Sequence, residues 1–324
     1  MRTRSVGSSD LTVSALGLGT MTWGHGTAVT DVVAMLKRFL DAGGNLLDTA
    51  ASYGYGEVEE LIGHLTRRTV DRSDLVLATK AGYVVHNGVR VVDTSAKALL
   101  ADLEGSLRRL RTDVIDLWQI HAWSDTPLEE TLGAADAAVR SGKVRHVGVS
   151  NFIGWQLGAA SAWQAALQQA PIVSTQAEYS LLSRGCEFEI LPCAEALGIG
   201  FFPWSPLGRG VLTGKYREGT PPQSRGASHN LSWFVEPYLN PGPRRIVNAV
   251  ATAAEGLRLT PAQVAYLWVR DAPGVTAPIV GCRTVEQLEP LLSIDTMELP
   301  AIVTSALDDV TGGPNPARQP AEEK

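Results

Sequence analysis

Four side chains that can move or bind protons follow short apolar runs of the chain. Asp48 lies in NLLDTA, Lys80 ends LVLATK and His121 ends LWQIH, while Tyr53 follows Asp48 in the Gly-rich stretch YGYG. Charged groups at the ends of hydrophobic strands are costly unless they pair, so we expect an ion pair between Asp48 and Lys80. A phenol titrates near pH 10, and a nearby ammonium stabilises its ionised form. The pattern therefore predicts that Lys80 lowers the pKa of Tyr53. Tyr53 would then exchange a proton with the oxygen of a substrate carbonyl group, and His121 would hydrogen-bond the same oxygen.

Each of these residues also has a simpler interpretation. Asp48 could cap a helix, Lys80 could be a surface lysine, and His121 could be structural. Tyr55, two residues after Tyr53, competes for the role of proton donor. The sequence has neither a metal-ligand cluster nor a Ser-His-Asp nucleophile, so the reduction of a carbonyl needs an external electron donor.

Eight short apolar runs position these residues. The candidate strands are residues 14–20, 44–50, 74–80, 113–121, 144–150, 172–178, 198–205 and 277–282. Segments with the helical spacing of apolar residues lie between them, at 30–43, 94–112, 131–142, 186–198 and 260–271. The alternation predicts a closed (β/α)₈ TIM barrel, with the chemistry at the C-terminal ends of its strands. An open doubly wound sheet is the alternative, but residues 17–24, GLGTMTWG, match its dinucleotide-binding turn only loosely.

Some segments depart from the alternation of strands and helices. Residues 4–16 predict an N-terminal β-hairpin that closes the bottom of the barrel. Substrate choice is expected to lie in long loops at the C-terminal face, residues 81–94, 122–128 and above all 206–241. Residues 312–324 predict a flexible tail, so residues 1–311 are expected to form a single domain.

The composition restricts the class of protein. The chain has 324 residues, of which 44% are hydrophobic and 19% charged, as in globular enzymes. Its net charge is −6 and no basic block stands out, so we expect no nucleic-acid partner. The sequence lacks a membrane-spanning run and a secretory signal, and its three cysteines lack metal spacing, which favours a soluble cytoplasmic protein. Its oligomeric state is not readable from these features.

Taken in order, the motifs of the chain resemble the aldo-keto reductase family, in particular its bacterial, potassium-channel β-subunit-like branch. The motifs are DTAASYGYGEVE, LATK, LWQIH, GVSNF, TQAEYSLL, WSPLGRG and VGCRTVEQL. The resemblance implies that Asp48, Tyr53, Lys80 and His121 form a catalytic tetrad in which Tyr53 is the general acid/base. It also implies NADP(H) as the cofactor.

The resemblance further implies a cofactor site along the later strands. Ser150, Asn151 and Gln176 would hydrogen-bond the nicotinamide carboxamide, and Trp204 would stack on its ring. The contacts implied for the pyrophosphate and the adenosine end are Ser205, Leu207, Gly210, Gly281, Arg283 and Gln287. A guanidinium near a 2′-phosphate would favour NADPH over NADH. Many relatives bind the adenine amino group with a Glu-Asn pair where this chain has Pro290-Leu291, so we expect adenine recognition to differ.

The substrate pocket is less well defined. Four aromatic residues in or near the expected top loops either form its wall or simply pack, namely Trp23, Tyr83, Trp123 and Trp233. The function that we expect is NADPH-dependent reduction of a small-molecule aldehyde or ketone. The alternatives are a nucleotide-sugar keto or enoyl reductase of deoxysugar biosynthesis, a barrel lyase or aldolase with Lys80 as a Schiff base, and a cofactor-sensing channel-β-like subunit.

Overall fold

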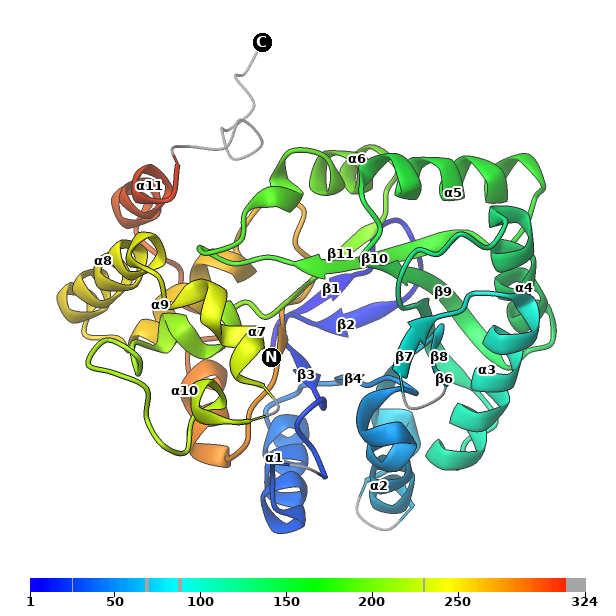
Figure 1. Ribbon diagram of the computed structural model, residues 1–324, viewed down its shortest axis with the longest axis horizontal. Coiled ribbons are helices and arrows are strands. Elements are labelled where there is room, and N and C mark those ends of the chain that lie inside the picture. Colours follow the sequence, from blue (N-terminus) through cyan, green and yellow to red (C-terminus); the bar gives the residue numbers. More distant parts are fainter. Residues whose placement is uncertain (25, 68–69, 87–88, 230, 313–324) are drawn as a thin grey trace.

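Eight parallel strands close into a barrel in the computed structural model, which describes residues 1–312 except 25, 68–69, 87–88 and 230 (Figure 1). The strands are β3 (Gly17–Gly19), β4 (Leu46–Asp48), β5 (Val76–Ala81), β8 (Ile115–Ile120), β9 (Val144–Ser150), β10 (Ile172–Glu178), β11 (Gly200–Trp204) and β12 (Ile279–Val280). Each strand lies within one of the eight predicted runs, except that β5 extends one residue past its run to Ala81, and most strands are shorter than the runs. The predicted (β/α)₈ barrel is confirmed.

The strand register sets which polar side chains can meet. In the parallel pair β4–β5, Asp48 lies opposite Ala78, two residues before Lys80. In the next pair, Lys80 lies opposite Gln119, two residues before His121. Side chains two residues apart on a strand point to the same face, so these ends all direct their polar groups into the same mouth of the barrel.

Helices surround the barrel and bury its outer surface. They are α1 (Val29–Asp41), α2 (Glu57–Thr66), α3 (Ala96–Leu110), α4 (Leu128–Arg140), α5 (Gly154–Ala166), α6 (Ile190–Ala196), α8 (Pro241–Leu257), α9 (Pro261–Arg270), α10 (Val285–Leu292) and α11 (Ala301–Val310). The sequence analysis predicted no helix at α2, α5, α10 or α11. It also did not predict α8. Its first turn reads PGPRR, which is typical of a loop, yet proline is well suited to the first turn of a helix. None of the helices in the described part of the chain has the length and apolar content needed to span a membrane.

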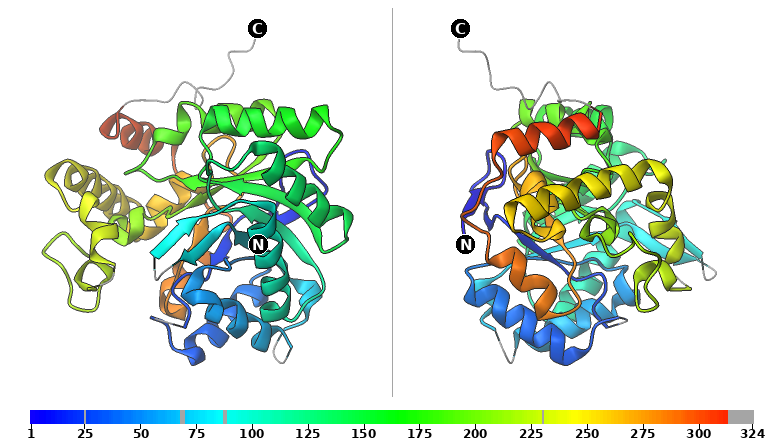
Figure 2. Two further views of the ribbon diagram at one scale, coloured as in Figure 1. Left: turned by 45° about the vertical axis from the view of Figure 1, so that its right-hand side comes forward. Right: turned by 90° about the vertical axis from the view of Figure 1, so that its left-hand side faces the viewer.

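The N-terminal hairpin closes the end of the barrel away from the polar strand ends. Its strands β1 (Thr3–Ser5) and β2 (Thr12–Ser14) pair antiparallel, as predicted. Val6 and Val13 belong to the same buried apolar cluster as Leu117 and Phe202 of the barrel strands. The right-hand view of Figure 2 shows this hairpin on the opposite side of the molecule from strands β6 (Tyr83–His86) and β7 (Val89–Val92).

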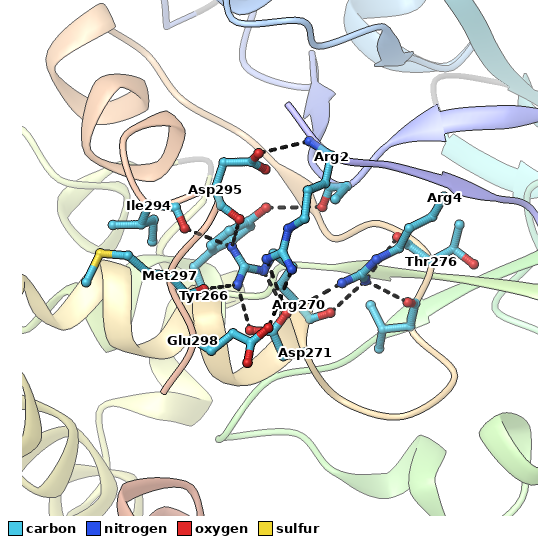
Figure 3. A network of polar contacts seen from close by, with 12 residues as sticks. Arg2, Arg4, Tyr266, Arg270, Asp271, Thr276, Ile294, Asp295, Met297 and Glu298 are labelled. Atoms are coloured by element: carbon cyan, nitrogen blue, oxygen red, sulfur yellow. Dashed lines mark hydrogen bonds and ion pairs between the residues drawn. The ribbon is translucent and has the colours of Figure 1, made fainter. Parts of the chain in front are cut away.

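A buried arginine joins the N-terminal strand to the segment before α11 (Figure 3). Arg270, which has no exposed surface, donates hydrogen bonds to the carbonyl oxygens of Ile294 and Asp295 at 3.0 and 3.1 Å. Its guanidinium also pairs with Asp271 at 2.6 Å. Arg4 of β1 donates to the carbonyl oxygen of Arg270 at 2.8 Å. This network fixes distant parts of the chain at the closed end.

Two segments at the open end, where the sequence predicted long loops, contain regular secondary structure. Strands β6 (Tyr83–His86) and β7 (Val89–Val92) form an antiparallel hairpin after β5. The segment after β11 contains η4 (Gly208–Thr213), η5 (Arg225–Ala227), α7 (Ser232–Val235) and η6 (Glu236–Tyr238). The sequence analysis did not predict this hairpin. Its valines come directly after an apolar strand and do not form a separate apolar face that would pack against the core.

Residues 313–324, where a flexible tail was predicted, lie outside the described residues.

Candidate active site

A buried ion pair lies at the centre of the open end. The Lys80 ammonium donates to both carboxylate oxygens of Asp48, at 2.8 and 2.7 Å, and to the carbonyl oxygen of Thr49 at 2.9 Å. Both side chains are almost completely buried. Burial by itself lowers the pKa of Lys80, but the charge of Asp48 and contact with Tyr53 outweigh it and raise the pKa. The lysine is therefore a fixed cation, as the sequence predicted.

Tyr53 lies beside this ammonium. The Lys80 nitrogen is 5.5 Å from the centre of the Tyr53 ring. Tyr53 begins η1 (Tyr53–Gly56), and the next three residues have left-handed backbone angles, with φ of 53°, 54° and 98°. Glycine adopts these angles without strain, so the two glycines of YGYG allow the sharp turn that returns Tyr53 to the barrel mouth.

The structure corrects the predicted pKa of Tyr53. Burial raises the pKa above the ordinary phenol value of 10.0, and the opposing charge of Lys80 offsets only part of that effect. The prediction of a lowered pKa is wrong in its net direction because it left out the cost of burying a phenolate. The Tyr53 phenol is consequently neutral beside a cation.

His121 also lies near the Tyr53 ring. The ring centres of the two residues are 6.1 Å apart, and Tyr83 of β6 packs edge-on against His121 at 4.8 Å. Burial, followed by the charges of Lys80 and Arg90, lowers the pKa of His121 well below 6.5. Its Nδ1 atom is buried and has no hydrogen-bond partner among the described residues. A neutral imidazole keeps one N–H donor, with which it can hydrogen-bond the oxygen of a substrate.

A chain of hydrogen bonds runs from Asp48 to the residues expected to hold a nicotinamide. Gln176 donates to Asp48 at 3.0 Å, and the Gln176 carbonyl oxygen accepts from the Ser150 hydroxyl at 3.1 Å. The Asn151 side chain donates to the His121 carbonyl oxygen and accepts from the Trp204 indole, each at 3.0 Å. The structure thus brings Ser150, Asn151, Gln176 and Trp204 together beside Asp48 and His121.

The segment after β11 makes a turn of left-handed residues. Ser205, Gly208 and Gly210 have φ of 54°, 55° and 92°, and the Gly210 amide donates to the Leu207 carbonyl oxygen at 3.0 Å. A side chain added at Gly210 would come within 3.2 Å of the Lys215 ammonium. Gly210 therefore leaves space next to a cation, as a backbone that approaches a phosphate requires.

Arg209, which the sequence analysis did not single out, stabilises this turn. Its guanidinium pairs with Glu178 through two hydrogen bonds of 2.8 and 2.7 Å and donates to the carbonyl oxygen of Phe234 at 2.7 Å. It also stacks on the Phe234 ring at 4.0 Å. Its position inside WSPLGRG was a signal, but its partners Glu178 and Phe234 lie 31 and 25 residues away, which only the fold reveals.

Three cations gather near this turn without a carboxylate partner in the described part of the chain. Burial, and then the charges of Arg283 and Arg225, lowers the pKa of Lys215. The pKa of Arg225 is likewise lowered, mainly by burial. The Ser224 hydroxyl next to Arg225 is buried and lacks a partner among the described residues. Uncompensated cations beside an unused hydroxyl suit the phosphates of a nucleotide. The sequence analysis identified only Arg283, because Lys215 and Arg225 lie in an irregular segment without periodicity.

The adenosine-end candidates occupy the start of α10. The Arg283 guanidinium donates to the Gln223 carbonyl oxygen, and the Arg283 amide donates to the Gln287 side chain at 3.0 Å. Gly281 is exposed just before them. The carbonyl oxygen of Pro290, within α10, accepts a hydrogen bond from the Gln263 side chain at 2.9 Å.

The four aromatic candidates for the substrate wall have different environments. Tyr83 contacts His121 directly, as described above. Trp123 packs against Phe152 and Trp155, and Trp233 is 65% exposed. Trp23 has no exposed surface and belongs to the main apolar core, so it does not line an open pocket in this structure.

Comparison with known proteins agrees with the geometry. The sequence model of the Aldo/keto reductase family matches residues 15–311. The chain is 35% identical to the "Uncharacterized oxidoreductase YrpG" of Bacillus subtilis (strain 168) over 321 residues, covering 95% of both chains. It is 34% identical to a "Probable voltage-gated potassium channel subunit beta" of Oryza sativa subsp. japonica, covering 92% of this chain and 93% of that protein. It is also 29% identical to the "Aldo-keto reductase YhdN" of Bacillus subtilis (strain 168), covering 96% of each.

The match to this family indicates that the protein is an oxidoreductase that acts on carbonyl groups. The chain belongs to the aldo/keto reductase family.

Proposed function

We propose that the protein is an NADPH-dependent reductase of aldehydes or ketones. The observation that carries the proposal is the pairing of Lys80 with both oxygens of Asp48 beside Tyr53. A permanently charged ammonium stabilises the phenolate that remains after Tyr53 has given up its proton. The raised pKa keeps the proton on Tyr53 until a developing alkoxide removes it.

The other residues of the site orient the carbonyl group. His121, neutral at physiological pH, donates a hydrogen bond to the carbonyl oxygen and holds it near the Tyr53 hydroxyl. The cofactor, when bound, supplies the hydride for the carbonyl carbon. Ser150, Asn151, Gln176 and Trp204 would hold its nicotinamide, since their polar groups already converge beside Asp48.

The basic cluster favours a phosphorylated nucleotide. Lys215, Arg225 and Arg283 would hold its phosphates, with Ser205, Leu207, Gly210 and Gly281 supplying backbone close to them and Gln287 near the adenosine. Lys215 and Arg225 lose hydration and repel Arg283 in the protein alone, so a phosphate that joins them would relieve both costs. Arg283 would lie at the 2′-phosphate, which NADPH carries and NADH lacks, and this contact is the basis for preferring NADPH.

The proposal is tested by following the absorbance of NADPH with a panel of aldehydes, ketones, quinones and nucleotide-linked keto sugars. Steady carbonyl-dependent oxidation of NADPH is the expected result. Turnover confined to keto sugars would assign the nucleotide-sugar alternative. Tight binding of NADPH without turnover on any substrate would contradict a reductase and favour a cofactor-sensing subunit; the rice relative is named as a potassium channel β subunit.

An aldolase that uses Lys80 as a Schiff base is disfavoured by the same geometry. A Schiff base needs a neutral amine, but Asp48 holds Lys80 as a buried cation with a raised pKa. Borohydride with a carbonyl substrate should therefore leave no covalent adduct on Lys80, which mass spectrometry of the intact protein checks.

A further inference from the structure

The β6–β7 hairpin places one arginine at the edge of the active site. Arg90 of β7 lies opposite Val85 of β6, and its guanidinium stacks 3.9 Å from the centre of the Tyr83 ring. Tyr83 in turn packs against His121 at 4.8 Å. The charged group is therefore separated from the imidazole by a single aromatic ring.

A second contact holds Arg90 close to the proton donor. Its Nη2 atom donates to the Ser52 hydroxyl at 2.8 Å, and Ser52 immediately precedes Tyr53. Arg90 is also among the charges that lower the pKa of both Tyr53 and His121, although burial dominates at each. Its field reaches both groups that would contact a carbonyl oxygen.

The charge of Arg90 is not balanced by the protein. Asp48 and Lys80 neutralise each other, and His121 and Tyr53 are neutral. Other arginines of the molecule bind carboxylates, such as Arg209 with Glu178 and Arg109 with Glu59. In the part of the chain that the structure describes, Arg90 contacts an aromatic face and a hydroxyl and forms no ion pair.

The way in which Arg90 is held leaves most of its donors free. A guanidinium carries five N–H donors in one plane, and stacking on an aromatic ring occupies its face rather than its edge. The hydrogen bond to Ser52 uses one donor. Arg90 is an exposed residue, so the remaining edge of its guanidinium can bind an oxyanion through two parallel hydrogen bonds.

We propose that Arg90 selects carbonyl substrates that carry an anionic group, a carboxylate or a phosphate, near the aldehyde or ketone. The anion binds the free edge of Arg90 while the carbonyl oxygen lies between Tyr53 and His121. The inference rests on the proposed reductase function and narrows it from carbonyl compounds in general to anionic ones.

The test compares substrates that differ only in charge. 3- and 4-Carboxybenzaldehyde are each paired with the corresponding formylbenzamide, which has nearly the same shape but no charge. Wild-type enzyme should show a higher kcat/KM for the carboxylates. Arg90→Met keeps an unbranched chain over Tyr83 and should lower kcat/KM for the carboxylates about 10-fold or more, the usual scale for losing a charged hydrogen bond. The amides should change much less.

Four controls separate the possible causes. Arg90→Lys keeps the charge and should retain most of the preference for carboxylates, and added salt should weaken that preference in the wild type. Arg140→Met, at a side chain 79% exposed on α4, removes one surface charge and should change neither substrate class. Benzoate, measured as a competitive inhibitor, should bind the Arg90→Met variant more weakly than the wild type.

The outcomes distinguish this inference from the proposed function. If the wild type reduces the amides as well as the carboxylates and Arg90→Met lowers both equally, Arg90 only supports the hairpin and the inference is overturned, while the reductase stands. If the wild type reduces no carbonyl compound of either class, both proposals fail together.

Discussion

At the scale of single residues, the unusual feature is a lysine without exposed surface whose ammonium has three oxygen neighbours. Removing two charges from water costs several kcal/mol for each ion, which mutual attraction offsets only when further hydrogen bonds complete the geometry. Lys80 meets that condition through both oxygens of Asp48 and the carbonyl oxygen of Thr49. The arrangement is expensive for stability, and we interpret it as serving the proton held by Tyr53.

Removal of the carboxylate tests this interpretation. Asp48→Asn leaves a buried ammonium without its counter-charge, so we expect a loss of about 3–5 kcal/mol in the free energy of unfolding and a large fall in turnover. Unfolding in urea and the rate of NADPH oxidation measure the two effects. As the matched control, Glu104→Gln breaks the half-exposed ion pair with Lys143 and should cost about 1 kcal/mol or less. A comparable loss in both variants would contradict a special role for the buried pair.

The pH dependence follows from the directions of the two pKa shifts. Tyr53 must be protonated to act as the acid, and its pKa lies above 10.0. His121 remains neutral down to well below pH 6.5 because its pKa is lowered. We therefore expect kcat/KM for carbonyl reduction to be flat from about pH 6.5 to about pH 9 and to fall only at higher pH. An inflection near 6.5 would show that His121 titrates normally and that its assigned state is wrong.

At the scale of elements, strands were easier to predict than the segments that follow them. A parallel strand buried on both sides must be apolar throughout, so all eight runs were visible, and with them Asp48, Lys80 and His121 at their ends. Helices α2, α5, α8, α10 and α11 and the β6–β7 hairpin were not predicted. The hairpin and α8 were missed because exposed valines and a Pro-Gly-Pro start resemble loops. Lys215, Arg225 and Arg209 were missed for the related reason that their positions depend on contacts with distant residues, such as Arg209 with Glu178.

The closed end of the barrel allows a test of how elements are joined. Arg270→Met removes the donor that satisfies the carbonyl oxygens of Ile294 and Asp295, so buried acceptors remain unpaired. We expect a loss of about 3 kcal/mol in the free energy of unfolding. The active site lies at the other end, so kcat should be unchanged in the folded variant. Arg140→Met serves as the exposed control; a loss in kcat without a loss in stability would contradict the division between the two ends.

At the scale of the whole molecule, the barrel separates stability from chemistry. The N-terminal hairpin and the Arg270 network close one end, while every proposed site residue lies toward the other or in the segments that follow its strands. Proteins of this fold keep their active sites at the C-terminal ends of the strands, where loops can change without loss of the core. The basic cluster and the tetrad come from segments far apart in the sequence, and the barrel brings them to one face.

Cofactor choice is a property of that assembled face. Arg283→Ala removes one of the three uncompensated cations, so we expect the KM for NADPH to rise about 10-fold, the scale of one charged hydrogen bond, with little change for NADH. The comparison of the two cofactors at one carbonyl concentration is the measurement. An equal rise for both would exclude contact of Arg283 with a 2′-phosphate.

The central claim is that Tyr53 donates the proton, and one measurement tests it most directly. The rate of carbonyl-dependent oxidation at saturating NADPH is compared for Tyr53→Phe and for Tyr55→Phe, the neighbouring phenol that is 82% exposed. We predict a loss of at least about 100-fold for Tyr53→Phe, with NADPH affinity retained, and a nearly unchanged rate for Tyr55→Phe. A Tyr53→Phe variant that kept most of its rate, or a Tyr55→Phe variant that lost it, would contradict the account.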